Sequence, residues 1–352
     1  MLAPNVRAAV TVASGVMELV DVREPDEPGP GQVLVRPEAV GLCGSDFHYF
    51  SGDIGTIEDK SVLYPRIQGH ETAGTVVGVG ADCPPELAPG TRVALWPVMS
   101  CGRCYACRIG RGNACSRISL IGVHADGALQ ELLLVPAAQA FPVGDQDPAL
   151  AALIEPVSIA VRAVNRGRIV RDERVVVLGA GPIGQALALA ATDRGASVLL
   201  VDTLPSRLER GAATGADVLC VDAGDDLADA IRDWAGEDGP EVVVEATGVP
   251  SLVQAAVELV AQAGRVVVVG LSDDPAPVRV GDLPLKEIDV LGVSCCGPSE
   301  FAGAVELVGR RRDVAAGLVT HEFPLERAPE AIAYAMEHPS EVMKTVVRIG
   351  AS

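Results

Sequence analysis

Lysine and aromatic residues are scarce in this chain. Among 352 residues there are only three lysines, Lys60, Lys286 and Lys344, and aromatic residues make up 3%. The formal net charge is −19 at pH 7. An excess of acidic groups repels phosphate backbones and anionic lipid surfaces. The composition therefore argues against nucleic-acid and membrane partners.

Long apolar runs and a secretion signal are also lacking. No run reaches the roughly 18 apolar residues that a membrane span requires. The first residues, MLAPNVRAAVTVASG, contain no basic region followed by a long apolar core. We therefore expect no membrane span and a cytoplasmic location.

Cysteine is present in an odd number, nine, which does not suggest a disulfide framework in a chain of this length. The segment 101–115, CGRCYACRIGRGNAC, holds four of them: Cys101, Cys104, Cys107 and Cys115. Four thiolates complete a tetrahedral shell around Zn²⁺ and leave no position open for chemistry, so the segment predicts a structural zinc. An iron–sulfur cluster is the alternative. In bacterial ferredoxins, however, three residues separate the last two cysteines and a proline follows the last one.

The chain is too long for one ordinary core and suits two domains. Up to about residue 150, short β-like runs such as VLVRPEAVGL and TRVALWPV alternate with Gly and Pro clusters, which predicts a β or barrel-like domain. From Arg174, apolar runs (VVVLG, SVLLVD, DVLCVD, EVVVEATG, RVVVVG, IDVLGVS) alternate with helix-period segments, one of them from about Ser251 to Ala261. This alternation predicts an α/β domain with a parallel sheet. The tail from about Ser299 is expected to be helical and then to end in the strand KTVVRIG.

A dinucleotide-binding motif opens the α/β part. VVVLGAGPIGQ places Gly179, Gly181 and Gly184 in G-x-G-x-x-G between a strand and a helix. The glycines allow a tight turn, close approach of a pyrophosphate and close helix–strand packing. Asp202 ends the next strand, SVLLVD, where a carboxylate accepts the ribose hydroxyls of NAD and repels the extra phosphate of NADP.

Arg207 keeps NADP open as an alternative, because a nearby guanidinium either stacks on adenine or tolerates a phosphate. NAD is the cofactor we expect. The other expected cofactor contacts are Pro182, Ile183, Thr247, Gly270 and Leu271.

Three distant segments, GLCGSDFHYF, QGHETAG and LIEPVSIA, supply a further possible metal site. Cys43, His70 and Glu155 offer sulfur, nitrogen and oxygen donors, a three-ligand set with one position open for water or substrate. Glu71, next to His70, is a further direct or supporting ligand. Each residue alone also has a plain structural explanation, since single cysteines are often buried and single glutamates solvated.

In this order, the glycine-flanked Cys43, the GHE segment, the four-cysteine segment and the glycine motif resemble the zinc-dependent medium-chain alcohol dehydrogenases. GSDFHYF, LIEPVS and VTHEFPLERAPEA look like the sorbitol and threonine dehydrogenase branch, and GVHADGALQE looks like bacterial dehydrogenases of sugar acids and polyols. The resemblance implies a GroES-like catalytic domain, residues 1–156 and 294–352, interrupted by a Rossmann NAD-binding domain, residues 157–293. It also implies two zinc ions per chain, one catalytic and one structural.

The resemblance assigns roles by position. The catalytic zinc ligands correspond to Cys43 and His70, with Glu71 and Glu155 as alternatives for one further coordination place. The hydroxyl relay corresponds to Ser45 and the outer proton carrier to His48. Lys344 corresponds to a basic residue near the cofactor pyrophosphate.

The implied activity is NAD-linked oxidation of a secondary alcohol of a polyol, sugar alcohol or cyclitol to the ketone, in a homodimer or homotetramer joined through IDVLGVS. A sugar acid or an amino alcohol remains an alternative substrate, and a non-enzymatic zinc- and NAD-binding paralogue is a further alternative. Zinc-free quinone oxidoreductases usually lack the Cys/His pair and the four-cysteine segment. Two departures from the family pattern weaken any inference of the substrate from the resemblance. Cys295 stands where sorbitol dehydrogenases usually have Arg, and the stretch Gly52 to Tyr64 is a little longer than in close sugar-acid relatives.

Overall fold

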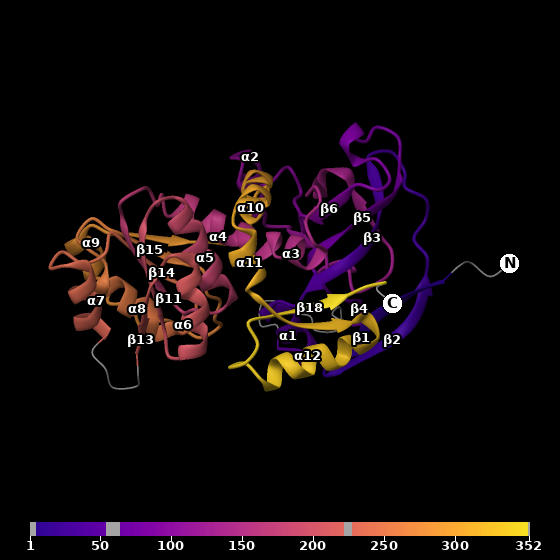
Figure 1. The fold of residues 1–352 in the computed structure, drawn as a ribbon. Helices are drawn as coiled ribbons and strands as arrows, with labels where there is room; N and C mark the ends of the chain where they lie inside the picture. Colours follow the sequence, from indigo (N-terminus) through magenta and orange to yellow (C-terminus); the bar gives the residue numbers. More distant parts are fainter. Residues whose placement is uncertain (1–4, 54–63, 222–226, 351–352) are drawn as a thin grey trace. The chain divides into compact units, whose positions relative to one another are not determined.

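A computed structural model of the chain describes residues 5–53, 64–221 and 227–350. The chain forms two compact units, one of Met1–Glu155 with Cys296–Ser352 and the other of Pro156–Cys295 (Figure 1). Most of the long stretch noted in the sequence, residues 54–63, lies outside the described residues.

The first unit is built on a seven-stranded sheet, in agreement with the predicted β domain. Its strand order is β10-β6-β5-β3-β18-β17, and β9 also pairs with β3. Valines alternate along β3 so that Val33 and Val35 are fully buried in the core. The strands are β3 (Gln32–Gly41), β5 (Glu71–Val79), β6 (Arg92–Leu95), β9 (Leu133–Pro136), β10 (Ala140–Pro142), β17 (Val319–Pro324) and β18 (Lys344–Arg348).

The end of the chain completes this sheet. β18 pairs antiparallel with β3 and parallel with β17. The strand KTVVRIG is thus where the sequence predicts it, but β17 was missed. Its sequence, VTHEFP, is half-exposed along most of its length and contains no apolar run that marks a strand.

Smaller elements surround the sheet in the first unit. Three strands form a second sheet of order β2-β1-β4, and β7 pairs with β8. These strands are β1 (Asn5–Ala13), β2 (Val16–Arg23), β4 (Arg66–Ile67), β7 (Val98–Met99) and β8 (Ser119–Leu120). The helices are α1 (Gly44–Ser51), α2 (Tyr105–Arg108), α3 (Pro148–Ala152), α10 (Pro298–Arg310), α11 (Arg312–Ala316) and α12 (Ala328–Glu337), with 3-10 turns at Pro85–Leu87, Gly112–Ala114, Ala137–Gln139 and Leu325–Arg327.

The second unit is the predicted doubly wound domain. Its six strands are all parallel, in the order β13-β12-β11-β14-β15-β16. Strand order reverses between β11 and β14, which is where this fold binds dinucleotides. The elements are α4 (Ile154–Arg166), β11 (Arg174–Leu178), α5 (Pro182–Asp193), β12 (Ser197–Asp202), α6 (Pro205–Gly211), a 3-10 turn (Ala212–Thr214), β13 (Asp217–Cys220), α7 (Leu227–Ala235), β14 (Val242–Glu245), α8 (Pro250–Leu259), β15 (Arg265–Val268), α9 (Asp282–Lys286) and β16 (Asp289–Gly292).

Both faces of the parallel sheet are buried, because successive side chains of a strand point to opposite faces. On one face, alternate strand residues pack against α7 and α8. This cluster includes Val176, Leu178, Val243, Ile231 and Val257. The intervening residues of the same strands, among them Val175 and Val177, are also fully buried. Continuous valine runs in the sequence reflect this two-sided burial.

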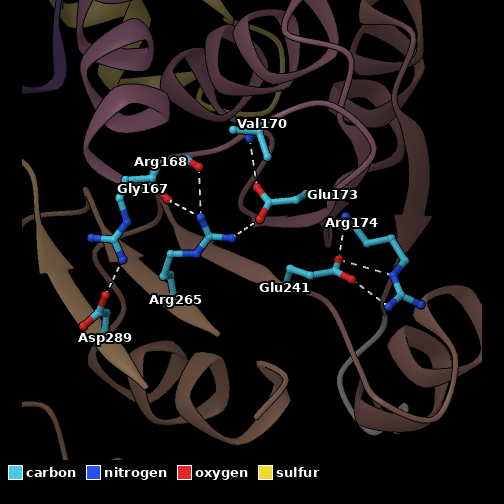
Figure 2. A network of polar contacts seen from close by, with 8 residues as sticks. All are labelled: Gly167, Arg168, Val170, Glu173, Arg174, Glu241, Arg265 and Asp289. Carbon is cyan, nitrogen blue, oxygen red and sulfur yellow. Dashed lines mark hydrogen bonds and ion pairs between the residues drawn. The ribbon is translucent and has the colours of Figure 1, made fainter. Parts of the chain in front are cut away.

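Ion pairs line the amino-terminal ends of these strands (Figure 2). Arg174, the first residue of β11, pairs with Glu241 at 2.8 Å. Arg265 of β15 pairs with Glu173, and Asp289 of β16 pairs with Arg168. The first pair joins the neighbouring strands β11 and β14, and the other two tie β15 and β16 to the loop between α4 and β11.

Cationic side chains also cap three helix C-termini in this unit. After α4, the Arg265 guanidinium donates to the carbonyls of Gly167 and Arg168, both at 2.9 Å (Figure 2). Arg174 donates to the Ala235 carbonyl at the end of α7. The ammonium group of Lys286 donates to the carbonyls of Val257, Glu258 and Val260 at the end of α8. These cations neutralise the partial negative charge of the helix ends.

One stretch passes a membrane test by length and composition. It is the helical stretch Pro148–Arg166, which has 19 residues. Within the protein, 72% of its apolar window is buried, as expected of a core helix.

Candidate functional site

The four cysteines of the segment 101–115 converge. Their sulfur atoms all lie within 4.8 Å of one another. Cys104 Sγ is 3.4 Å from Cys107 Sγ and 3.8 Å from Cys115 Sγ. Sulfurs around tetrahedral zinc are separated by about 3.8 Å when each Zn–S bond is about 2.3 Å. A disulfide would bring two of them to about 2.05 Å, so the arrangement fits zinc instead.

Hydrogen bonds favour the thiolate form of two of these cysteines, whereas burial and the neighbouring thiols raise the pKa of Cys107 to about 11. The backbone N–H of Arg103 and the guanidinium of Arg117 lower the pKa of Cys101 to about 5. The N–H groups of Cys107 and Ser116 lower the pKa of Cys104 to about 7. Arg117 donates from its side chain to Cys101 Sγ and from its backbone to Cys115 Sγ, both at 3.3 Å. This compensating charge was not predicted from the sequence.

A second cluster forms around Cys43, the residue that caps the N-terminus of α1. Ligand atoms of Cys43, His70 and Glu71 lie within 4.8 Å of one another. His70 precedes β5 and Glu71 begins it, while Cys43 follows β3, the strand paired with β5. The pairing of two neighbouring strands therefore brings together residues that are 27 positions apart.

Lys344 holds the Glu71 carboxylate from β18. Its Nζ donates to Glu71 Oε1 at 2.7 Å and to the Leu42 carbonyl at 3.0 Å, and Lys344 is only 3% exposed. A Cβ on Gly41 would overlap Glu71 Oε2, so glycine at position 41 makes room for the carboxylate. The ammonium group of Lys344 is thus directed to Glu71. The expected role of Lys344 beside the cofactor pyrophosphate stays a prediction.

A buried chain of hydrogen bonds supports the cluster from the other side. Asp46 Oδ2 accepts the backbone N–H of Cys43 at 2.9 Å and lies 3.7 Å from His70 Nδ1. Gln68 Nε2 donates to the Asp46 carbonyl at 2.8 Å and to Oδ1 at 3.3 Å. The Thr11 hydroxyl in turn donates to Gln68 Oε1 at 2.5 Å. All three supporting side chains are buried, so the carboxylate that faces His70 has a fixed position.

Burial and neighbouring charges shift the pKa values of three groups in and around the cluster. Burial lowers the pKa of His70, but the charges of Asp46, Cys43 and Glu155 raise it well above its ordinary value. Burial raises the pKa of Asp46. Burial also raises the pKa of Glu155 to about 7, against the opposing effect of His70. Glu155 thus lies within electrostatic reach of His70, although it is not part of the tight three-residue set.

One carboxylate oxygen of the cluster lacks a hydrogen-bond partner. Glu71 Oε2 is buried and is not hydrogen-bonded within the part of the chain that the structure describes. His70 Nδ1 also makes no hydrogen bond there, but it faces Asp46 Oδ2 at 3.7 Å. Buried polar atoms are normally satisfied, so the Glu71 oxygen beside a cysteine thiol indicates a missing ligand. Sulfur, nitrogen and carboxylate donors match the preferences of zinc.

The two residues of the expected proton relay share one helix. Ser45 and His48 lie on α1, three positions apart, which places them on one helix face. Ser45 is half-buried and His48 is exposed. The pair thus extends from the cluster end of α1 towards solvent.

The glycine motif has the geometry that dinucleotide binding needs. Gly179 has φ = 100°, in the left-handed region that favours glycine. A Cβ on Gly184 would overlap the Gly179 carbonyl, so the third glycine permits close packing. A Cβ on Gly181 would meet only Arg207 Nη1, at 4.0 Å, so space is open for a pyrophosphate. Pro182 and Ile183 begin α5, whose N-terminal N–H groups favour phosphate.

Asp202 lies at the carboxyl end of β12, as the sequence predicted. Its Oδ2 accepts the N–H of Ala180 in the glycine motif at 2.6 Å, and its Oδ1 accepts the N–H of Leu204 at 2.9 Å. Arg207 Nη1 is 3.8 Å from Asp202 Oδ2. The structure therefore brings Asp202, Arg207 and the glycine motif together.

Thr247, Gly270 and Leu271 follow the carboxyl ends of β14 and β15, on the same sheet edge as the glycine motif. Leu271 is 88% exposed. Sequence reasoning did not name the buried residues that support the two sites, chiefly Asp46, Gln68 and Glu245. Their only sequence signal was a polar residue next to a predicted ligand or at a strand end.

Comparisons with known proteins agree with these two sites. Residues 29–145 match the alcohol dehydrogenase GroES-like domain, and residues 182–310 match the zinc-binding dehydrogenase domain. The chain is 35% identical to L-galactonate-5-dehydrogenase of Escherichia coli K12 over 326 residues, 92% of this chain and 94% of that protein. It is 34% identical to human sorbitol dehydrogenase over 334 residues, 93% of this chain and 92% of that enzyme.

A solved structure shares the whole fold. It is an alcohol dehydrogenase from Escherichia coli CFT073 in complex with NADH, with a TM-score of 0.87 and 27% identity over 98% of this chain and 99% of that one. This protein therefore has a GroES-like and a Rossmann-type domain, and its cofactors are zinc and a nicotinamide dinucleotide. The chain belongs to the zinc-dependent medium-chain alcohol dehydrogenases, oxidoreductases that act on CH–OH groups.

Proposed function

We propose that this protein oxidises a secondary alcohol of a neutral polyol, sugar alcohol or cyclitol to the ketone, with NAD as the acceptor. The observation that carries the choice of a neutral substrate is the charge around the Cys43 cluster. Asp46, Glu71 and Glu155 are all buried there, and the nearby ammonium group of Lys344 is bound to Glu71. A carboxylate substrate would add a further negative charge to this low-dielectric region.

Cys43, His70 and Glu71 are the residues we propose for the catalytic zinc. Their mutual distances and the partnerless Glu71 Oε2 support this set, with Glu155 as the alternative carboxylate. Cys101, Cys104, Cys107 and Cys115 would hold the structural zinc. When bound, catalytic zinc supplies Lewis acidity at the substrate oxygen, and the nicotinamide accepts the hydride.

The side chains of α1 move the proton. The Ser45 hydroxyl, half-buried beside Cys43, accepts the proton that the substrate alcohol loses and releases its own proton towards the cofactor ribose and His48. His48, three residues further along and exposed, passes it to water, a task to which histidine is suited near neutral pH. Asp46 takes no proton in this scheme and fixes the orientation of His70.

NAD rather than NADP is the proposed cofactor, because the Asp202 carboxylate lies beside the glycine motif and would repel a ribose phosphate. Changing Asp202 to alanine removes this repulsion while Arg207 remains available to a phosphate. We expect the ratio of kcat/KM for NAD over NADP to fall by about tenfold or more. Equal ratios in wild type and variant would exclude this role for Asp202.

A substrate panel tests the proposed function. Sugar alcohols, inositols, aminocyclitols, aldonates, threonine and butanediol are each offered with NAD, and NADH formation is followed by absorbance. We expect the highest kcat/KM for a neutral polyhydroxylated compound. L-Galactonate is included because a sugar-acid dehydrogenase is among the relatives. A clear preference for an aldonate would establish the second candidate function, and no NADH with any alcohol would reject both.

Assembly and location complete the proposal. β16 is an edge strand, and its Val290 is 45% exposed. Val280 and Leu285 nearby are 72% and 83% exposed. Unpaired edges with apolar side chains favour pairing with a second copy, so we propose a homodimer or homotetramer through β16. We propose a cytoplasmic location because none of the nine cysteines, all of them among the described residues, forms a disulfide, as is usual in reducing compartments.

The domain boundaries we propose are residues 1–156 and 294–352 for the catalytic domain and 157–293 for the NAD-binding domain. Their support is the glycine motif and parallel sheet in one segment and both cysteine clusters in the other.

A further inference from the structure

One buried carboxylate, that of Glu245, links two loops that carry expected cofactor contacts. Glu245 ends β14 and is 0% exposed. Its Oε1 accepts the N–H of Thr247 at 2.6 Å, the N–H of Gly248 at 2.9 Å and the Thr247 hydroxyl at 2.5 Å. Three donors from one short loop therefore converge on a single oxygen.

The same residue also holds the loop after β15. Its backbone carbonyl accepts the N–H groups of Val269 at 2.9 Å and Gly270 at 3.2 Å. Its Oε2 is buried without a hydrogen-bond partner among the described residues. A Cβ on Gly270 would lie 2.6 Å from Oε2 and would overlap the backbone nitrogen of Gly248. Glycine at 270 therefore allows the two loops to touch over the carboxylate.

These contacts extend to the glycine motif. A Cβ on Gly179 would lie 2.6 Å from Thr247 Cγ2, and a Cβ on Gly248 would overlap the Leu271 carbonyl. The loops after β11, β14 and β15 are thus in direct contact at the carboxyl ends of their strands. A buried carboxylate is costly unless donors satisfy it, so Glu245 draws the Thr247–Gly248 donors inward.

We propose that Glu245 is a positioning residue for the nicotinamide dinucleotide, which orders the loop 246–249 against the loop 269–271 before the cofactor binds. The inference rests on the proposed function of these loops in holding NAD. Ordering a loop in advance removes part of the entropy loss of binding, so Glu245 raises cofactor affinity without touching the cofactor. A glutamine has the same shape, but it offers a weaker, neutral acceptor and places an NH₂ group in the position of Oε2.

The test is NADH binding to the zinc-loaded E245Q variant, followed by nicotinamide fluorescence. We expect the Kd for NADH to rise about tenfold and the KM for NAD to rise with it, while kcat at saturating NAD changes little. E241Q is the matched control, because Glu241 precedes the same strand at its opposite end and pairs with Arg174. A Kd within twofold of wild type in E245Q, or the same rise in E241Q, would overturn the proposal.

Amide hydrogen exchange of the cofactor-free proteins provides an independent measurement. The amides of Thr247 and Gly248 should exchange faster in E245Q than in wild type, whereas E241Q should leave them unchanged. If E245Q fails to fold, E245D serves instead, since it keeps the charge but withdraws the carboxylate. Wild-type protein that does not bind NADH would reject the proposed function, while unchanged exchange in the Glu245 variant would reject the positioning role alone.

Discussion

The two cysteine-containing clusters of the first unit differ in how they are built. One takes four like donors from residues 101–115, and backbone N–H groups in or next to this segment lower the pKa values of Cys101 and Cys104. The other takes unlike donors from separate segments. It is buried and has further carboxylates close by, those of Asp46 and Glu155. The first set of ligands is complete without any other part of the chain. The second depends on strand pairing and on buried supports such as Asp46.

The difference indicates that the segment 101–115 stabilises the fold, whereas the Cys43 cluster takes part in the reaction. Four thiolates fill a tetrahedral shell, so the segment 101–115 offers no place for a substrate. The Cys43 cluster has three candidate ligands, so a metal there would keep an open position. If this contrast is correct, damage to the two clusters must have different consequences.

The largest effect is expected from Cys43→Ser. Loss of the thiolate removes a proposed catalytic ligand, so turnover should fall by at least about a thousandfold while NADH binding persists. Measurements are NADH formation, NADH fluorescence titration and zinc content, which should drop from two to one per chain. Cys83→Ser is the matched control, since the Cys83 thiol donates to the Gln32 carbonyl and belongs to neither cluster. Retained turnover in Cys43→Ser would erase the distinction between the clusters.

Cys107→Ser should act on stability instead. Without its fourth thiolate the segment 101–115 loses zinc, and we expect the Tm to fall by roughly 5 to 10 °C. Turnover per folded molecule should stay within about twofold of wild type. Calorimetry and zinc analysis check the expectation, with the exposed Arg111→Ala as the control from the same segment. A thousandfold loss of turnover at unchanged Tm would show that this cluster also takes part in chemistry.

Gln68→Leu tests the dependence of the second cluster on buried support. Asp46 would lose the Gln68 amide donor, and His70 would lose its fixed neighbour. We expect zinc release to a chelator to become about tenfold faster and kcat/KM to fall by a similar factor. Gln139→Leu removes another buried amide, which donates to the Val98 carbonyl, and should change neither quantity. Equal effects of the two variants would point to general destabilisation.

The smallest effect is expected from Arg117→Gln. Its guanidinium stabilises the Cys101 thiolate from an exposed position, where solvent screens the charge. Zinc in the segment 101–115 should become a few-fold easier to extract, with unchanged turnover. Arg117→Lys should restore most of the retention. Full retention of zinc in the glutamine variant would show that backbone donors alone suffice.

The sequence predicted the fold well where a local pattern reports burial on both sides. The valine runs of β11, β14 and β15 and the glycines at 179, 181 and 184 identify the parallel domain without further information. β17 escaped prediction because VTHEFP is half-exposed and is defined mainly by its pairing with β18.

The sites follow the same rule. The four-cysteine site could be predicted because its ligands are neighbours in sequence. The ion pair between Lys344 and Glu71 joins residues 273 positions apart, and only the pairing of β18 with β3 and of β3 with β5 makes it possible. Likewise, no spacing rule connects Thr11, Gln68 and Asp46, because their chain of hydrogen bonds joins β1, the residues between β4 and β5, and α1.

The burial of Lys344 has a practical use. Of the three lysines in the sequence, Lys286 donates to three carbonyls and Lys344 is only 3% exposed. An amine-specific label can reach Lys344 only when the protein around Glu71 opens, so its rate of modification, followed by peptide mass spectrometry, measures that opening. Because the chain has so few lysines, Lys344 can serve as a specific chemical probe of local opening beside the proposed zinc ligands.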